Sequence, residues 1–355
     1  MKKRVVVAMS GGVDSSVAAA LLQRKGFEVI GMTMCFSLPD SSRKRPNCCG
    51  LSGIEDARRV AHKLGLRHYV VPMQKQLDES VIRDFCQEYL SGRTPNPCVR
   101  CNQFLKFDIL LKKALFLGAE YLATGHYARI TRAKNIFQLK KAKDLNKDQS
   151  YFLYRLNQDQ LKRILFPLGD YTKSQVRDLA RKFALPVSEK PGSQDVCFIP
   201  DSDYHKFLKS RLGRKIKPGP VKDTKGCIIG THKGIAYYTI GQRGGLGIAR
   251  GYPVYVTAIN QKDNSITVGK REDALKSEFL LRDVSFINKP AKNKIAPQVR
   301  IRYNHKEQRA EASCLKGSIT VRFKEPQFAI TPGQSAVLYD EDKVLGGGII
   351  DYILE

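Results

Sequence analysis

Long apolar runs are missing from this chain of 355 residues. No segment is long enough to span a bilayer, and the first apolar run ends too early, at Ser10-Gly11-Gly12, to be the core of a signal peptide. We therefore expect a cytoplasmic protein with no membrane partner. Internal repeats and low-complexity tracts are missing as well, which excludes a repeat architecture.

Acidic residues are scarce relative to basic ones. The chain has 34 Asp and Glu against 61 Lys and Arg, a formal net charge of +27. Such an excess costs self-repulsion unless a polyanion offsets it, and nucleic acid is the first candidate, with a membrane surface second. The excess is concentrated from Arg282 to Lys324, where 11 basic residues stand against 3 acidic ones.

The Gly-Lys-Ser/Thr of the Walker phosphate loop is also missing, but a different glycine turn stands near the start of the chain. Val5–Met9 predicts a strand, Ser10-Gly11-Gly12 a tight turn, and residues 16–25 a helix. Backbone N–H groups in such a turn point outward at the positive end of a helix dipole. They form an anion site, most often for phosphate. Asp14 could hold a divalent cation on the phosphates.

Strand and helix patterns alternate through the first 125 residues, which predicts an α/β fold with a parallel sheet wrapped by helices. The expected strands are 5–9, 28–34, 67–72 and 120–124, and the expected helices are 16–25, 54–64, 78–90, 103–117, 151–165 and 173–184. Ligands bind beyond the C-terminal ends of such strands. The glycine turn and Gly125-His126 both fall there, so we expect them to share one site.

The pattern changes after about residue 210 to short β-rich runs with frequent glycine. These runs are 227–230, 235–240, 254–259, 265–268, 298–303, 318–323 and 335–339. Their spacing predicts a small β-rich domain and a C-terminal β-barrel. Because the chain is too long for one core, we expect an α/β domain at 1–205, a central β-rich domain at 206–275 and the barrel at 276–355.

Nine cysteines in a chain expected in the cytoplasm do not suit structural disulfides. Cys98-Val99-Arg100-Cys101 precedes a helix that we expect Asn102 to cap, so its thiols should favour the thiolate. A redox pair, half of a metal site and a catalytic nucleophile stay open. Cys197 is either a movable reactive thiol in the loop 186–200 or a packed apolar cysteine, and Cys48-Cys49 could bind metal. Core positions are expected for Cys35, Cys86, Cys227 and Cys314.

Seven motifs occur in order along the chain. They are AMSGGVDS (8–15), TPNPCVRCN (94–102), ATGHYAR (123–129), KDQSY (147–151), FPLGDY (166–171), SQDVCFIP (193–200) and YTIGQRGGLGI (238–248). Together they resemble the bacterial tRNA-specific 2-thiouridylases, which belong to the PP-loop ATP pyrophosphatases. The resemblance covers nearly the whole chain and implies a Rossmann-like PP-loop catalytic domain at 1–205 and a tRNA-binding barrel at 276–355.

The resemblance implies ATP-dependent 2-thiolation of the wobble uridine of certain tRNAs, with Mg²⁺. The C2 oxygen is activated by adenylation and then replaced by sulfur from a cysteine persulfide, which releases AMP and pyrophosphate. The resemblance implies that Cys197 carries the persulfide, that Cys101 helps to release the sulfur or receives a disulfide from Cys197, and that Asp14 is catalytic. A sulfur-relay protein or a cysteine desulfurase would supply the persulfide.

The resemblance also assigns ligand contacts. ATP contacts carry over to Ala8, Met9, Ser10, Gly11, Gly12, Val13, Asp14, Ser15, Met34 and Gly125. Contacts with tRNA carry over to Asn96, Pro97, Cys98, His126, Lys147, Asp148, Gln149, Arg302, Tyr303 and Gln334. Many relatives have Asp where this chain has Cys98. This difference leaves the partner thiol open between Cys98 and Cys101, and Cys101 is favoured because both subtypes share it. Cys98, Cys101 and Cys197 together could also hold an iron–sulfur cluster with one open iron, as an alternative to the persulfide route, or Cys98 could only position the backbone.

Two other functions fit parts of the chain. A PP-loop ligase or amidotransferase would use ammonia or an amine as the nucleophile, and would leave Cys101 and Cys197 without a role. A non-catalytic RNA-binding protein with a vestigial turn would be expected to lose Asp14, which is intact.

Overall fold

The computed structural model describes residues 2–36, 51–192, 196–199, 203–248, 250–315 and 317–354. Two compact units divide the chain. The first comprises Met1–Val81, Cys98–Ser202 and Asp342–Val344, and the second comprises Ile82–Pro97, Asp203–Glu341 and Leu345–Glu355. Cys48-Cys49, considered above as a metal pair, lie outside the described residues. The three-domain division stays a prediction.

A five-stranded parallel sheet forms the centre of the first unit. Its strands are β1 (Arg4–Ala8), β2 (Glu28–Cys35), β3 (Arg67–Pro72), β4 (Tyr121–Ala123) and β7 (Ile164–Leu165), in the order β3-β2-β1-β4-β7. Val5, Val6 and Val7 of the central strand are fully buried, as a strand covered on both faces requires. The expected parallel sheet is confirmed.

Helices lie in both units of the chain. They are α1 (Val13–Arg24), α2 (Leu51–Lys63), α3 (Gln74–Leu77), α4 (Arg83–Leu90), α5 (Pro97–Arg100), α6 (Leu111–Phe116), α7 (Gln158–Leu161), α8 (Lys173–Lys182) and α9 (Tyr204–Leu212). Asp78–Ile82 and Cys101–Leu110 are π-helical. Among the described residues, none of the helices is both long and apolar enough to cross a membrane.

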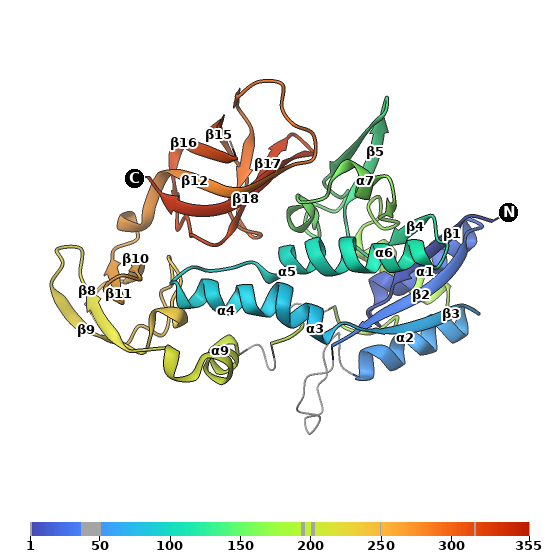
Figure 1. Ribbon diagram of the computed structural model, residues 1–355, viewed down its shortest axis with the longest axis horizontal. Helices are drawn as coiled ribbons and strands as arrows, with labels where there is room; N and C mark the ends of the chain where they lie inside the picture. Colours follow the sequence, from blue (N-terminus) through green and yellow to red (C-terminus); the bar gives the residue numbers. More distant parts are fainter. Residues whose placement is uncertain are drawn as a thin grey trace. The chain divides into compact units, whose positions relative to one another are not determined.

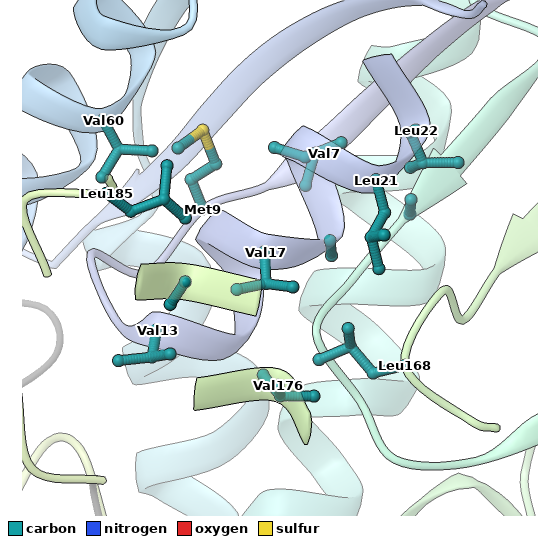
Figure 2. Packing of buried hydrophobic residues seen from close by; sticks show 14 of the residues in the cluster. Val7, Met9, Val13, Val17, Leu21, Leu22, Val60, Leu168, Val176 and Leu185 are labelled. Carbon is teal, nitrogen blue, oxygen red and sulfur yellow. The ribbon is translucent and has the colours of Figure 1, made fainter. Parts of the chain in front are cut away.

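The core of the first unit surrounds α1. Val17 and Leu21 of α1 belong to one buried cluster with Val7 of β1, with Met9 just after that strand, and with Val176 of α8 (Figure 2). Helix α1 packs on β1, β2 and α8. Helix α2 packs on β2 and β3 (Figure 1). This packing fixes the position of the turn between β1 and α1 relative to the ends of the other strands.

The expected helix over 151–165 is wrong. The segment forms a 3₁₀ turn at Ser150–Leu153, then α7 and β7. Asn157 and Gln160 form a capping box, which starts the new helix α7 after the 3₁₀ turn. The hairpin of β5 (Arg129–Ala133) and β6 (Ile136–Lys140) was not expected either, although its alternating residues predict strands.

A four-stranded sheet lies in the second unit. Its strands are β8 (Gly219–Lys222), β9 (Ile228–His232), β10 (Tyr255–Asn260) and β11 (Ser265–Gly269), in the order β10-β11-β8-β9. The strand expected at 235–240 does not form, since Ile235–Tyr237 is a 3₁₀ turn that follows Gly234, whose φ is 137°. Cys227, expected in a core, is exposed beside β9. Gly213–Lys215 and Glu272–Ala274 are also 3₁₀ turns.

The chain ends in a β-barrel. Its strands are β12 (Leu275–Phe286), β13 (Lys294–Ile295), β14 (Gln298–Arg300), β15 (Gln308–Leu315), β16 (Ser318–Phe328), β17 (Ser335–Asp340) and β18 (Lys343–Ile353). Six of them follow the order β12-β16-β15-β14-β17-β18, and β12 pairs with β18 to close the barrel, orange to red in Figure 1. Phe279, Leu281 and Val321 are fully buried in its core. The expected barrel is confirmed.

Candidate nucleotide site and thiol cluster

The turn between β1 and α1 requires glycine. Gly11 has a φ of +74°, and a Cβ there would lie 2.2 Å from the carbonyl oxygen of Gly53 in α2. Gly12 then leads into α1, which begins at Val13, three residues before the expected start. The first N–H groups of a helix have no partner within the helix. Because the glycines beside them have no side chains in the way, these N–H groups can donate hydrogen bonds to a bound anion.

Hydroxyl groups stabilise the turn from inside. Ser10 donates its backbone N–H to the Oγ of Ser15 at 3.2 Å. The hydroxyls of Ser15 and Ser16 donate to the Gly12 carbonyl oxygen, at 3.2 and 2.8 Å. Ser15 and Ser16 are buried, whereas Ser10 is exposed. Ser10 is therefore the hydroxyl of this turn that is open to a ligand.

Asp14, in the first turn of α1, has two internal partners. Its Oδ1 accepts hydrogen bonds from the Tyr127 hydroxyl at 2.8 Å and from the Lys173 ammonium at 2.6 Å. Burial and the charge of Asp14 raise the pKa of Tyr127, so this hydroxyl keeps its proton and donates it. Lys173 is the first residue of α8, which Thr172 starts with a capping box. A capping box predicts that helix start, but no sequence signal points Lys173 at Asp14.

Lys190 attaches the turn to α2. Its ammonium donates to the Gly11 carbonyl oxygen at 3.2 Å and to Asp56 Oδ2 at 2.5 Å. Burial by itself would raise the pKa of Asp56, but the hydrogen bonds from Lys190 and Arg59 outweigh it and hold this pKa below its ordinary value. The sequence gives no signal for this contact, because its residues are more than a hundred positions apart.

The segment after β4 packs against the turn, as expected from the sheet topology. A Cβ on Gly125 would lie 2.7 Å from both the backbone carbon of Asp14 and the nitrogen of Ser15. Tyr127 donates its backbone N–H to Gln149 Oε1 at 3.0 Å and accepts the N–H of Gln149 at 2.8 Å. Gln149 therefore positions Tyr127, which in turn contacts Asp14.

His126, between Gly125 and Tyr127 in the chain, is buried. Its Nδ1 is 2.7 Å from the Thr124 hydroxyl, and its ring lies 5.8 Å from that of Phe107 and 5.9 Å from that of Phe166. Burial, and secondly the charge of Lys106, lower the pKa of His126 well below its ordinary value. The side chain is therefore neutral at pH 7.

The cysteines expected to react lie within electrostatic reach of one another. Cys98 is exposed in α5, Cys101 is buried at the start of the π-helical segment, and Cys197 is half-buried. A charge on Cys197 raises the pKa of both other thiols. The structure thus brings Cys197 within electrostatic reach of Cys98 and Cys101, which lie almost a hundred residues earlier in the chain.

The expected thiolate at the Cys98–Cys101 motif is wrong for the free protein. Burial raises the pKa of Cys101 to about 12, and desolvation raises that of Cys98 as well, although this residue keeps an exposed surface. Asn102 does not cap a helix here. It lies inside the π-helical segment, and its Nδ2 donates to the Phe152 carbonyl oxygen at 3.2 Å. Cys98 lies in the first turn of α5, whereas Cys101 lies further inside the helical segment that begins at Pro97, away from its N-terminus.

The residues that the structure describes include no group of three His, Cys, Asp or Glu side chains arranged to hold a metal ion. Cys98, Cys101 and Cys197 therefore do not fit the iron–sulfur cluster considered above.

Another residue expected to contact tRNA, Asp148, is held inside the protein. The Asp148 carboxylate is 2% exposed and accepts the Ala142 N–H at 2.9 Å and the Ser150 hydroxyl at 2.8 Å. Lys147, by contrast, is exposed. Met34, expected beside ATP, is half-buried near the C-terminal end of β2.

In the second unit, Gln334 holds the segment that leads to Asn96-Pro97. Its Nε2 donates to the Thr94 carbonyl oxygen at 2.9 Å. Arg302 donates to the carbonyl oxygens of Phe328 and Ala329, both at 3.2 Å. The ring of Tyr303 lies under the Arg300 guanidinium, at 5.5 Å. These expected tRNA contacts thus have internal partners in the second unit.

The parallel sheet and its glycine turn define a nucleotide-binding α/β domain, and comparison with protein families agrees. Residues 3–201 match a family described as tRNA methyl transferase HUP domain. Residues 205–270 match the tRNA methyl transferase PRC-barrel domain, and residues 276–350 match the aminomethyltransferase beta-barrel domain.

Full-length relatives are more specific. The chain is 48% identical over 357 residues to the tRNA-specific 2-thiouridylase MnmA of Carboxydothermus hydrogenoformans, covering 99% of this chain and 98% of that relative. It is 46% identical over 357 residues to the protein of the same name from Clostridium perfringens, covering 99% of each. The chain belongs to the tRNA-specific 2-thiouridylases, a family of enzymes.

Solved structures are more distant. The U34-tRNA thiolase NcsA from Methanococcus maripaludis, solved with its 4Fe-4S cluster, is 20% identical, with a TM-score of 0.36, and the match covers 60% of this chain and 69% of that one. A likeness at that level carries no argument about the cofactors of this chain.

Proposed function

We propose that this protein catalyses the ATP-dependent 2-thiolation of the wobble uridine of certain tRNAs. In this reaction the C2 oxygen is adenylated and then replaced by sulfur from a cysteine persulfide. One observation supports the proposal most, namely that the segment Gly125–Tyr127 links the glycine turn to the thiol cluster. Gly125 and Tyr127 contact the glycine turn, while His126 lies within reach of the same Lys106 charge that acts on Cys98 and Cys101. An anion site and a thiol cluster thus belong to one unit.

The nucleotide half of the reaction follows from the turn. The C2 carbonyl of uridine is a poor electrophile with no leaving group, so its oxygen must first be converted into one. The N–H groups at the start of α1 would bind the phosphates and stabilise the charge that develops on pyrophosphate. Asp14 would hold Mg²⁺, which lowers the negative charge of the phosphates when bound. Lys173 would then be free to contact them.

The sulfur half follows from the cysteines. The terminal sulfur of a persulfide on Cys197 would form a bond to C2 as the bond from C2 to the AMP oxygen breaks. A thiolate on Cys101 would then attack the Cys197 sulfur. The sulfur–sulfur bond of the persulfide breaks, the thiocarbonyl stays on uridine, and a Cys101–Cys197 disulfide remains for an external dithiol to reduce. A sulfur-relay protein or a cysteine desulfurase would supply each new persulfide.

The remaining expectations belong to the same proposal. The net charge of +27 suits a tRNA partner, and exposed Lys147 is a direct candidate for a phosphate contact. Gln334 would act by holding the backbone before Asn96-Pro97, next to the base. We place the reaction in the cytoplasm, where tRNA is present.

The test is nucleoside mass analysis of unmodified tRNA after anaerobic incubation with the protein, ATP, Mg²⁺ and a cysteine desulfurase system. We expect 2-thiouridine at the wobble position, together with AMP and pyrophosphate. Cys197→Ser should abolish thiolation but keep pyrophosphate release, Asp14→Ala should lose both, and Cys314→Ser should resemble the wild type. Thiolation by Cys197→Ser would contradict the assigned carrier. AMP and pyrophosphate released by the wild type without sulfur in the tRNA would contradict the proposed reaction.

A further inference from the structure

The π-helical segment Cys101–Leu110 changes which side chains share a face with Cys101. In an α-helix of 3.6 residues per turn, residues five apart point in directions about 140° apart. In a π-helix the hydrogen bonds join residues five apart, so these residues lie close to one face. Lys106 is five positions after Cys101. The π-helical winding therefore brings its side chain toward the thiol, where an α-helix would turn it away.

Lys106 is half-buried. No residue that the structure describes forms an ion pair or a hydrogen bond with its ammonium group. A partly desolvated cation without a partner costs free energy, which a nearby anion would recover. Its electrostatic neighbours are Cys98, Cys101 and His126, whose pKa values it lowers.

Only the thiols among these neighbours can become that anion. His126 is neutral and buried, so it supplies neither a negative charge nor a competing positive one. The groups that act on Cys101 are Lys106, which favours its thiolate, and the thiols of Cys197 and Cys98, which oppose it when charged. Burial also opposes the thiolate. Lys106 is therefore the group in this cluster that offsets the cost of charging Cys101.

We propose that Lys106 is a positioning residue that supplies the positive charge against which Cys101 forms its thiolate, with the proton released to solvent. The role in sulfur transfer rests on the function proposed above, in which the Cys101 thiolate attacks Cys197. The effect of Lys106 on thiol reactivity does not, because it is a property of the free protein.

The test measures alkylation of each cysteine in the full-length reduced protein, with no tRNA present. Iodoacetamide is added from pH 7 to 10, and peptide mass spectrometry gives the rate at every thiol. Lys106→Met should slow alkylation of Cys101 about three- to tenfold at a given pH, because the thiolate fraction falls when the pKa of the thiol rises. Lys106→Arg should keep the rate close to that of the wild type.

Two controls separate charge from structure. Cys314, in the barrel, reports alkylation without Lys106, and Lys113→Met removes an exposed lysine from the neighbouring helix α6. Lys106→Met should leave the Cys314 rate unchanged, and Lys113→Met should leave the Cys101 rate unchanged. If Lys106→Met lowers the unfolding temperature strongly, Lys106→Gln replaces it with a polar side chain of similar length.

The outcomes are distinct. Slower Cys101 alkylation in the Met or Gln variant, restored by arginine, supports the proposal even if the protein thiolates no tRNA. Equal rates in wild type and both neutral variants would overturn it, and so would an arginine variant as slow as the neutral ones. If 2-thiouridine forms, the neutral variants should make it more slowly, with the pH optimum moved upward. An unchanged optimum would remove Lys106 from the reaction.

Discussion

Gly125→Ala tests the contact between the segment after β4 and the glycine turn. The added Cβ would lie 2.7 Å from the backbone carbon of Asp14 and from the nitrogen of Ser15, where ordinary contacts begin at 3.4 Å. Backbone atoms cannot rotate away as a side chain can, so the start of α1 must move by roughly 0.7 Å. Overpacking of this kind costs about 1 to 3 kcal/mol of folding free energy.

The same shift should weaken nucleotide binding, because the N–H groups that would contact the phosphates move with α1. A displacement of this size should reduce ATP affinity at least about tenfold. The assays are thermal unfolding and isothermal titration with ATP and Mg²⁺. We expect a Tm several degrees lower and a weaker Kd.

Gly230→Ala is the matched control, since a Cβ there would meet only the Val221 side chain, at 4.0 Å. It should leave ATP affinity unchanged. A Gly125→Ala protein with wild-type Tm and ATP affinity would refute the reasoning, because it would mean that the turn does not depend on this close approach.

Three further predictions concern charge. Hydrogen bonds from Lys190 hold the pKa of Asp56 below its ordinary value of 3.8, so their contribution to folding stability is present above about pH 4 and is lost as the pH falls further. Lys190→Met should cost about 1 to 2 kcal/mol of folding free energy at pH 7. In urea unfolding, the difference in stability from the wild type should close toward pH 3. A gap independent of pH would contradict this. His126 stays neutral in the folded protein but takes up a proton near pH 6.5 when the protein is unfolded, so it removes about 1.4 kcal/mol of stability per pH unit below 6.5. The stability of His126→Asn should therefore decline less steeply than that of the wild type from pH 6.5 to 5.5. Equal declines would mean that the histidine is protonated in the folded protein. Lys147→Ala should weaken tRNA binding and reduce the slope of log affinity against log salt concentration by about 1. Lys112→Ala, which removes a partner of Asp108, should change neither. Equal slopes for Lys147→Ala and the wild type would place Lys147 away from the RNA.

Much of the fold could be predicted because its signals are local. A buried β-branched run such as Val5–Val7 indicates a central parallel strand, and Gly11 marks the turn after it. Strand order could be anticipated only in part, but the contact of Gly125 with Asp14 follows from parallel strands ending at the same edge. The failure at 151–165 was also local, since Asn157 with Gln160 is a capping signature inside an apolar pattern.

The chemical state of the site could not be predicted. The spacing of Cys98 and Cys101 suggested thiolates at a helix N-terminus, whereas burial raises both pKa values. Desolvation depends on every atom packed around a sulfur, and those atoms come from distant segments. A pattern of neighbouring residues contains no measure of it.

The sequence by itself determined the family, the parallel sheet, the barrel and the reactive residue types, because each leaves a pattern within a few neighbouring residues. Only the tertiary structure decided which cations act on them. Lys173 reaches Asp14 across 159 positions and Lys190 reaches Asp56 across 134. Lys106 comes toward Cys101 because the helix between them is wound as a π-helix. Charge acts through space, and folding sets those distances.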